Sequence, residues 1–221
     1  LDECIDAGIK EIVFIISTKK QMIKKYFYSD TFYQNIIKKK KDQRIIDEYK
    51  KILKYKKKIK FVYQNIPKGT GDAVLKTQKF IKNKYFLMLL PDDLIIKKNC
   101  SKAMVRAHKK YKASVMASMK VNKKTVSRWG IYKLNKKLNK TDYVIDGVVE
   151  KPSVKNAPSN NAVIGRYILP RTIFKKLKSL KPSKGNEIHI TDAIQELIND
   201  KVKFVAHNFE GKYLDCGTMK G

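Results

Sequence analysis

The sequence predicts an α/β protein with a mostly parallel central sheet and a smaller mixed sheet laid against it. In the first half, short apolar runs of strand length alternate with amphipathic stretches of helical spacing. Strands separated by helices in this order form right-handed βαβ units, whose strands are parallel. In the second half, three strand-like runs follow one another, and no helix separates the first two. No linker or repeat divides the 221 residues, so we expect one compact domain.

Apolar runs, glycines and helix caps set the elements of the first half. In chain order we expect a helix at Leu1–Ala7 closed by Gly8, a strand at Glu11–Ser17, a helix around Met22–Phe27, a Lys-rich helical stretch from about Thr31 to Lys58, a strand at Ile59–Gln64, a helix at Asp72–Ile81, a strand at Tyr85–Leu90, a helix at Ser101–Tyr111 and a strand at Ala113–Val121. Tyr85–Leu90 is apolar throughout, which is typical of a central parallel strand. In the Lys-rich stretch, Ile36 and Ile37 begin an apolar pattern near helical spacing, and the run Lys38–Lys41 is expected on a solvated face.

The second half begins near residue 122. It is expected to hold strands at Trp129–Leu134, Tyr143–Glu150 and Asn161–Leu169, helices at Thr172–Leu180 and Thr191–Asn199, and a last strand at Val202–His207.

Charge and composition limit the classes of function. Fifty Lys and Arg against twenty Asp and Glu give a formal net charge of +30, which first suggests nucleic acid. Only five of the fifty are Arg, whereas base readout and bidentate phosphate contacts favour Arg. We therefore expect no nucleic-acid partner, and we attribute the charge either to compositional drift or to a field that collects anionic substrates.

Apolar runs and cysteines indicate the compartment. No apolar run approaches the roughly 18 residues of a membrane-spanning helix, so no membrane partner is expected. Cys4, Cys100 and Cys216 are odd in number and far apart, and they fit neither a disulfide framework nor a zinc motif. A cytoplasmic, reducing location follows.

Polar residues gather at the predicted carboxyl ends of strands, where open parallel sheets bind ligands. They are Gln64, the turn glycines Gly69 and Gly71, the acids Asp92 and Asp93, the pair Glu150 and Lys151, and Asp215 after the last strand. Each has an ordinary structural explanation, as a turn glycine, a turn cap or a surface ion pair. Together they supply hard oxygen ligands, a cation and glycine-lined walls, which suit Mg²⁺ and phosphates.

Several motifs resemble the bacterial UTP–glucose-1-phosphate uridylyltransferases, or UDP-glucose pyrophosphorylases, of the sugar nucleotidyltransferase family. They are Glu3–Ile9 (ECIDAGI), Lys68–Val74 (KGTGDAV), Leu90–Asp92 (LPD), Gly147–Pro152 (GVVEKP), Ala157–Asn160 (APSN), Ile164–Ile168 (IGRYI), Asn186–Ile194 (NEIHITDAI) and Asp215–Gly217 (DCG). The resemblance covers essentially the whole chain. It implies a Rossmann-like nucleotidyltransferase fold, with about 1–121 binding the nucleotide and about 122–221 the sugar phosphate.

The resemblance also implies the reaction and the residues that carry it. Glucose 1-phosphate would attack the α-phosphorus of UTP in line and release pyrophosphate, with Mg²⁺ as cofactor and a homo-oligomeric full-length enzyme. The implied roles are Mg²⁺ binding by Asp92 and Asp215, neutralisation of the sugar phosphate by Lys151, hydroxyl recognition by Glu150, close backbone approach to the sugar at Gly130 and Gly165, and a uracil pocket lined by Gln64, Gly69 and Gly71.

Two departures and two alternatives accompany this interpretation. The family usually has Gly where this chain has Asn65, and His where it has Asp72. A sister enzyme using dTTP or another nucleotide is the nearest alternative, and a basic nucleic-acid-binding module is the remote one. The family's Gly-rich triphosphate loop would precede Leu1 and its last helices would follow Gly221, so we expect these 221 residues alone to be inactive.

Overall fold

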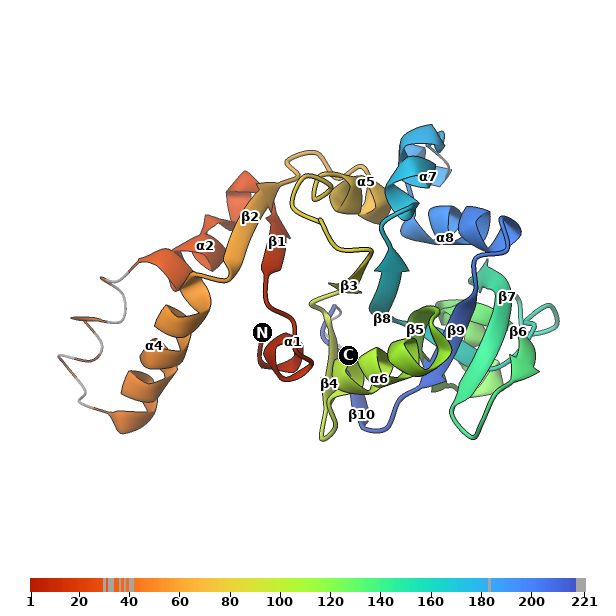
Figure 1. Cartoon of the computed structure of the whole chain (residues 1–221), viewed down its shortest axis with the longest axis horizontal. Coiled ribbons are helices and arrows are strands. Elements are labelled where there is room, and N and C mark those ends of the chain that lie inside the picture. The colour runs from red at the N-terminus through yellow and green to blue at the C-terminus, as the bar shows by residue number, and fades with distance from the viewer. Residues whose placement is uncertain are drawn as a thin grey trace.

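The computed structural model describes residues 1–29, 31, 34, 35, 37, 39, 42–182 and 184–217 (Figure 1). Within these residues the strands form one six-stranded sheet and two separate pairs. The sheet has the order β3 (Tyr85–Leu89), β8 (Asn161–Pro170), β5 (Ser114–Lys120), β9 (Phe204–Asn208), β7 (Asp142–Glu150) and β6 (Gly130–Lys137). The pairs are β1 (Ile12–Ile16) with β2 (Ile59–Tyr63), and β4 (Asp93–Ile96) with β10 (Lys212–Asp215).

The sheet is mixed, so the prediction of a mostly parallel sheet was wrong. Among the described residues, only β1–β2 and β5–β9 pair in parallel. β3 and β5 run in the same direction, but β8 lies between them and is antiparallel to both. β3 therefore ends the sheet order instead of lying at its centre. β6 and β7 continue the same sheet and do not form a separate smaller one.

Helices cover both faces of the six-stranded sheet. On one face, α5 (Gly69–Leu75), α7 (Ile173–Ser179) and α8 (Ile190–Asn199) pack in a core that includes Met116 of β5. On the other face, α6 (Cys100–Tyr111) packs against Val115 and Ala117, and α1 (Asp2–Asp6) contacts α6. Side chains alternate across a strand, so neighbouring residues of β5 serve opposite cores. In the described part of the chain, no helix combines the length and apolar character needed to cross a membrane.

A smaller unit of α2 (Gln21–Tyr28), α4 (Gln43–Lys56), β1 and β2 extends from the main body, at the left of Figure 1. Phe27, Ile52 and Ile59 form its core, and Asp42 caps α4 by accepting a hydrogen bond from the Arg44 backbone at 2.9 Å. This confirms the later part of the predicted Lys-rich helix, whereas Ile36 and most of the run 38–41 lie outside the described residues. Short 3₁₀ turns occupy Thr18–Lys20, Lys123–Arg128 and Lys184–Asn186.

Most predicted elements lie within a few residues of their observed bounds. One helix has different bounds, and two short strands were not predicted. α5 begins at Gly69 and ends at Leu75, so the two turn glycines belong to its first turn and the helix stops well before Ile81. The four-residue strands β4 and β10 were missed, and their pairing places Asp93 opposite Asp215.

Candidate active site

Asp92 and Asp215 converge beside Gly217, although they are far apart in sequence. The pairing of β4 with β10 brings the two segments together, and the Cys216 backbone donates to the Asp92 carbonyl at 2.8 Å. A Cβ at Gly217 would lie 3.1 Å from Asp92 Oδ2 and 3.3 Å from Asp215 Oδ1. Glycine thus leaves room between the two acids. The Asp92 carboxylate accepts no hydrogen bond from any described residue, which leaves it available to a ligand.

The neighbouring Asp93 is occupied by the protein itself. Its carboxylate accepts a hydrogen bond from the Tyr213 hydroxyl at 2.5 Å and from the Gly165 backbone at 2.6 Å. Burial raises the pKa of Tyr213, and the hydrogen bond with Asp93 and the charges of Asp93, Asp215 and Asp92 raise it further. Of these three carboxylates, Asp93 is the one that the Tyr213 hydroxyl contacts.

The donor set fits a magnesium ion shared with a substrate. Among the described residues, no three His, Cys, Asp or Glu side chains meet in an arrangement that holds a metal alone. Mg²⁺ usually retains waters and binds through one or two carboxylates together with substrate phosphates. The convergent Asp92 and Asp215 match that pattern, whereas a dedicated all-protein site would need more ligands.

A carboxylate and an ammonium stand side by side at the end of β7. Glu150 and Lys151 are both exposed, and neither forms a salt bridge with a described residue. Lys151 has a φ of +46°, a left-handed conformation that is costly for a residue with a Cβ. Its backbone N–H donates to the Trp129 carbonyl at 3.0 Å. The two residues are therefore not an ordinary surface ion pair. The left-handed conformation is shared by Lys97, Lys112 and Lys201, so Lys151 is distinguished by its position beside Glu150.

Gly130 lies opposite Glu150 in the ladder between β6 and β7. A Cβ at Gly130 would lie 3.0 Å from Glu150 Oε2 and would crowd the carboxylate. Gly165 is equally constrained, because a Cβ there would lie 2.5 Å from Asp93 Oδ2 and 2.6 Å from the Leu90 Cβ. Both glycines therefore make room for side chains of the site itself.

Aromatic residues join the Glu150–Lys151 group to the aspartates. The rings of Trp129 and Tyr213 are 5.6 Å apart between centroids. Burial raises the pKa of Tyr167, and the nearby charges of Asp93 and Glu150 add to the shift. The structure therefore brings these predicted residues into one region.

Gln64, Gly69 and Gly71 form a second group, built on β2 and α5. Gln64 Nε2 donates to Asp72 Oδ2 at 2.7 Å and to the Gly69 carbonyl at 3.1 Å. Gly69 has a φ of +90°, and a Cβ on it would lie 2.5 Å from the Ile188 carbonyl oxygen, to which the Gly71 backbone donates at 2.7 Å. These glycines let α5 pack against the segment before α8. The role of this group in binding the base stays a prediction.

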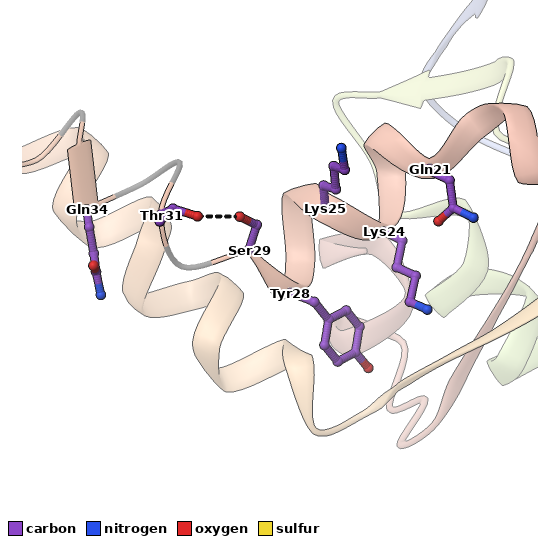
Figure 2. A pocket seen from close by; sticks show the side chains of 7 residues that line it. All are labelled: Gln21, Lys24, Lys25, Tyr28, Ser29, Thr31 and Gln34. Atoms are coloured by element: carbon purple, nitrogen blue, oxygen red, sulfur yellow. Dashed lines mark hydrogen bonds between the residues drawn. The ribbon is translucent and has the colours of Figure 1, made fainter.

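A hollow of about 600 Å³ lies elsewhere, along α2 and the residues after it. Figure 2 shows its lining side chains, Gln21, Lys24, Lys25, Tyr28, Ser29, Thr31 and Gln34. None of them is a predicted site residue, and none is a carboxylate that could bind a metal. We therefore take the Asp92–Asp215 cluster, and not this hollow, as the candidate active site.

Three residues that contact predicted site residues were not predicted to do so. Tyr213 contacts Asp93 at the Asp92–Asp215 cluster, Trp129 contacts Lys151, and Asp72 contacts Gln64 in the second group. Position in the chain offered a signal for two of them, since Tyr213 precedes Asp215 by two residues and Trp129 immediately precedes Gly130.

Comparisons with known proteins show the family of this chain. The profile of the nucleotidyl transferase family matches residues 1–221. A UTP–glucose-1-phosphate uridylyltransferase of Streptococcus pyogenes is 35% identical over 229 residues, which cover 100% of this chain and 73% of the relative. A crystal structure of UDP-glucose pyrophosphorylase complexed with UDP-glucose has a TM-score of 0.84 and 33% identity, covering 99% of this chain and 80% of that one. A UTP-bound UGPase from Acinetobacter baumannii has a TM-score of 0.86 and 29% identity, covering 99% and 76%.

Proposed function

Because this chain belongs to the nucleotidyl transferase family, we propose that it makes UDP-glucose and pyrophosphate from UTP and glucose 1-phosphate. One observation carries the assignment of this activity to particular residues. The convergent carboxylates of Asp92 and Asp215 lie beside Asp93, which accepts a hydrogen bond from Tyr213. Tyr213 packs on Trp129, whose carbonyl accepts a hydrogen bond from the Lys151 backbone. Glu150 and Lys151 make no salt bridge with a described residue. Such a site offers charge neutralisation and positioning, which are what phosphoryl and nucleotidyl transfer require.

The reaction is an in-line substitution at the α-phosphorus of UTP. A phosphate oxygen of glucose 1-phosphate forms the new P–O bond, and the bond to pyrophosphate breaks. No protein nucleophile takes part. Because both reactants are anions, the main task of the protein is to hold them in contact against their repulsion.

Asp92 and Asp215 would hold Mg²⁺. When bound, the ion neutralises and orients the phosphates. The two carboxylates would bind it from the turn before β4 and from the end of β10, and Gly217 leaves room between them. Asp93 keeps its carboxylate turned to Tyr213 and Gly165 and so serves the geometry of the site.

Lys151 and Glu150 bind the two halves of the sugar phosphate. The Lys151 ammonium is a point charge suited to the phosphate, and the Glu150 carboxylate accepts hydrogen bonds from sugar hydroxyls. Gly130 lets the ring approach next to Glu150. The backbone of Gly165 is expected to face the sugar from β8, and the lack of a side chain there makes room for Asp93 and Leu90. Residues of about 122–221 thus serve the sugar phosphate and residues of about 1–121 the nucleotide, within one domain.

Gln64, Gly69 and Gly71 line the uracil pocket in this proposal. Asp72, which stands where the family usually has His, accepts from Gln64 Nε2 and leaves Gln64 Oε1 without a donor among the described residues. That oxygen suits the N3–H of uracil. A uracil or thymine edge would satisfy it equally, so the sister enzyme using dTTP remains the competing function.

The assembly and the compartment are also part of the proposal. Resemblance to the family supports a homo-oligomer of the full-length protein, which light scattering of the purified enzyme tests. The free thiols of Cys4, Cys100 and Cys216 fit the cytoplasm. No nucleic-acid or membrane partner is proposed.

Pyrophosphate release from different nucleotides tests the function. With glucose 1-phosphate, the full-length enzyme should use UTP about tenfold or more faster than ATP, GTP or CTP, because a wrong base edge leaves buried polar groups unpaired at about 1–3 kcal/mol each. Equal release from UTP and GTP would contradict the proposal. Comparable use of dTTP would favour the sister enzyme.

A further inference from the structure

Arg166 is a buried charge inside β8. Arg166 is only 3% exposed, and it is one of five arginines among fifty basic residues. A buried guanidinium loses its hydration, so it needs several partners. Arg166 has four: the carbonyls of Leu90, Gly165 and Asp93, and the carboxylate of Glu3.

Two of these partners belong to the turn that carries Asp92. Arg166 Nη1 donates to the Leu90 carbonyl at 2.9 Å, and Nη2 donates to the Asp93 carbonyl at 2.6 Å. One guanidinium therefore forms hydrogen bonds with the main chain on both sides of Pro91 and Asp92. Only a planar, multiply donating cation can reach both carbonyls and a carboxylate together, which a lysine ammonium cannot.

Glu3 fixes the guanidinium from the opposite side. Its carboxylate accepts from Arg166 Nε at 3.1 Å and Nη2 at 3.0 Å, and also from the Ser101 hydroxyl at 2.5 Å. Burial raises the pKa of Glu3, but the hydrogen bonds from Arg166 and Ser101 outweigh it and the pKa lies below its usual value. The pair is therefore charged, and it links α1, α6 and β8 to the Asp92 turn.

We propose that Arg166, held by Glu3, is a positioning residue for the metal site: it fixes the Leu90–Asp93 turn so that the Asp92 carboxylate faces Asp215. A buried ion pair is a poor way to gain stability, since apolar residues of similar size often do as well. Holding the Leu90–Asp93 turn in place would explain why the buried Arg166–Glu3 pair is present. The inference rests on the proposed function through the role of Asp92.

Arg166→Lys in the full-length enzyme tests this, because it keeps the charge and removes the fork of donors. Two readouts separate positioning from stability: the Mg²⁺ concentration giving half-maximal rate, and deuterium exchange of the backbone of residues 88–96, which needs no metal. Leu197→Ala, in the core at α8, is the matched destabilised control. If Arg166→Lys does not fold, the charge-free double variant Glu3→Gln/Arg166→Met replaces it.

We expect the half-maximal Mg²⁺ concentration to rise about 10–100-fold in the Arg166 variant, as for other residues that orient metal ligands. Deuterium exchange of residues 88–96 should also rise in the Arg166 variant. Leu197→Ala should lower Tm but leave both the Mg²⁺ requirement and this exchange unchanged. An Arg166 variant with wild-type Mg²⁺ requirement, or a Leu197→Ala variant with the same change, would overturn the inference. Asp92→Asn is the separate check: if it leaves the Mg²⁺ requirement unchanged, the proposed metal site fails instead.

Discussion

Two adjacent aspartates, Asp92 just before β4 and Asp93 at its first residue, have different contacts, and mutation separates their proposed roles. Asp92→Asn or Asp215→Asn removes a charge at the proposed metal site, so kcat/KM should fall by about 10² or more with little change in Tm. Asp93→Asn should lower Tm as well. Tyr213 and the Gly165 backbone donate to different oxygens of Asp93, and in Asn an NH2 donor replaces one of them. Steady-state rates and thermal unfolding of the three variants provide the measurement. If Asp92→Asn is fully active and Asp93→Asn is stable but inactive, Asp93 and not Asp92 is the metal-binding residue.

Lys151 is one of 45 lysines, and its left-handed backbone sets it apart from most of them. If its ammonium contacts the phosphate of glucose 1-phosphate, Lys151→Ala should lower kcat/KM by about 10²–10³, the loss usual for one preorganised electrostatic contact.

Lys155→Ala is the control for general charge loss, since Lys155 is exposed and nearby. A surface lysine of this kind should change the free energy of unfolding by less than about 0.5 kcal/mol and the rate hardly at all. Equal, modest losses in the two variants would assign Lys151 to the diffuse positive field of the protein.

At the residue scale, the sequence predicts candidate catalytic and metal-binding residues, but it does not predict the residues that hold them in place. Asp92, Asp215 and Lys151 follow apolar runs or precede glycines, so local pattern pointed to them. Arg166 and Tyr213 matter because of partners far away in the chain, such as Leu90 and Asp93. No local pattern encodes those contacts, and only the fold reveals them.

At the element scale, the first turn of α5 depends on Gly69. Gly69→Ala should lower stability by more than Gly8→Ala and should raise KM for UTP. Both positions have positive φ, +90° and +87°, so both variants bear the same backbone strain of about 1–2 kcal/mol. Only at Gly69 would the new Cβ meet a backbone atom, Ile188 O at 2.5 Å, whereas nothing lies within 4 Å at Gly8.

Urea unfolding and UTP saturation curves of the two glycine variants measure this difference. If both variants lose equal stability, α5 shifts to accommodate the new Cβ without a further loss of stability, and the close approach of Gly69 to Ile188 does not matter.

A buried polar cluster joins β7, β9 and α6 and should make stability depend on pH. Asp142 accepts hydrogen bonds from Tyr111 at 2.8 Å and Asn139 at 2.7 Å, and it pairs with Nδ1 of His207. Burial raises the pKa of Asp142, but these bonds outweigh it and the folded-state pKa is lowered. Its contribution to stability is therefore present above the unfolded pKa of about 3.9 and is lost as pH falls through the lower folded value.

Asp142→Asn should thus be less stable than wild type at pH 5, and the difference should narrow towards pH 3. Urea unfolding of both proteins at several pH values between 3 and 5 measures this difference in the free energy of unfolding. A stability difference that stays constant between those pH values would mean that Asp142 contributes by shape and not by charge.

The elements themselves were largely predictable, and their pairing was not. Apolar period and capping residues located strands such as β5 and helices such as α6, where Asn99 caps the first turn. β8 inserts between β3 and β5 although many residues separate it from both, and this reverses the expected strand pairing. β4 and β10 are four residues long and are defined only by each other, so neither carries a pattern of its own.

At the scale of the whole molecule, the net charge of +30 is the dominant feature. The described ion pairs outside the Glu3–Arg166 contact are mostly exposed, as between Lys51 and Asp2 or Lys60 and Glu11, and such pairs contribute little. Repulsion among the many remaining lysines therefore opposes the compact state. Added salt should relieve it, because the Debye length shrinks to about 8–10 Å at physiological ionic strength.

Raising NaCl should accordingly raise Tm, by about 2–4 °C for each 1 kcal/mol of repulsion removed in a chain of this size. The same salt should lower kcat/KM if the field helps to collect two anionic substrates, whereas a short-range contact at Lys151 should persist. Thermal unfolding and initial rates across one salt series measure both effects, with Lys151→Ala and Lys155→Ala run beside the wild type. A Tm that falls with salt would mean that attraction between charge pairs outweighs lysine repulsion. A rate that ignores salt would leave the positive charge without a role in catalysis and would favour compositional drift as its origin.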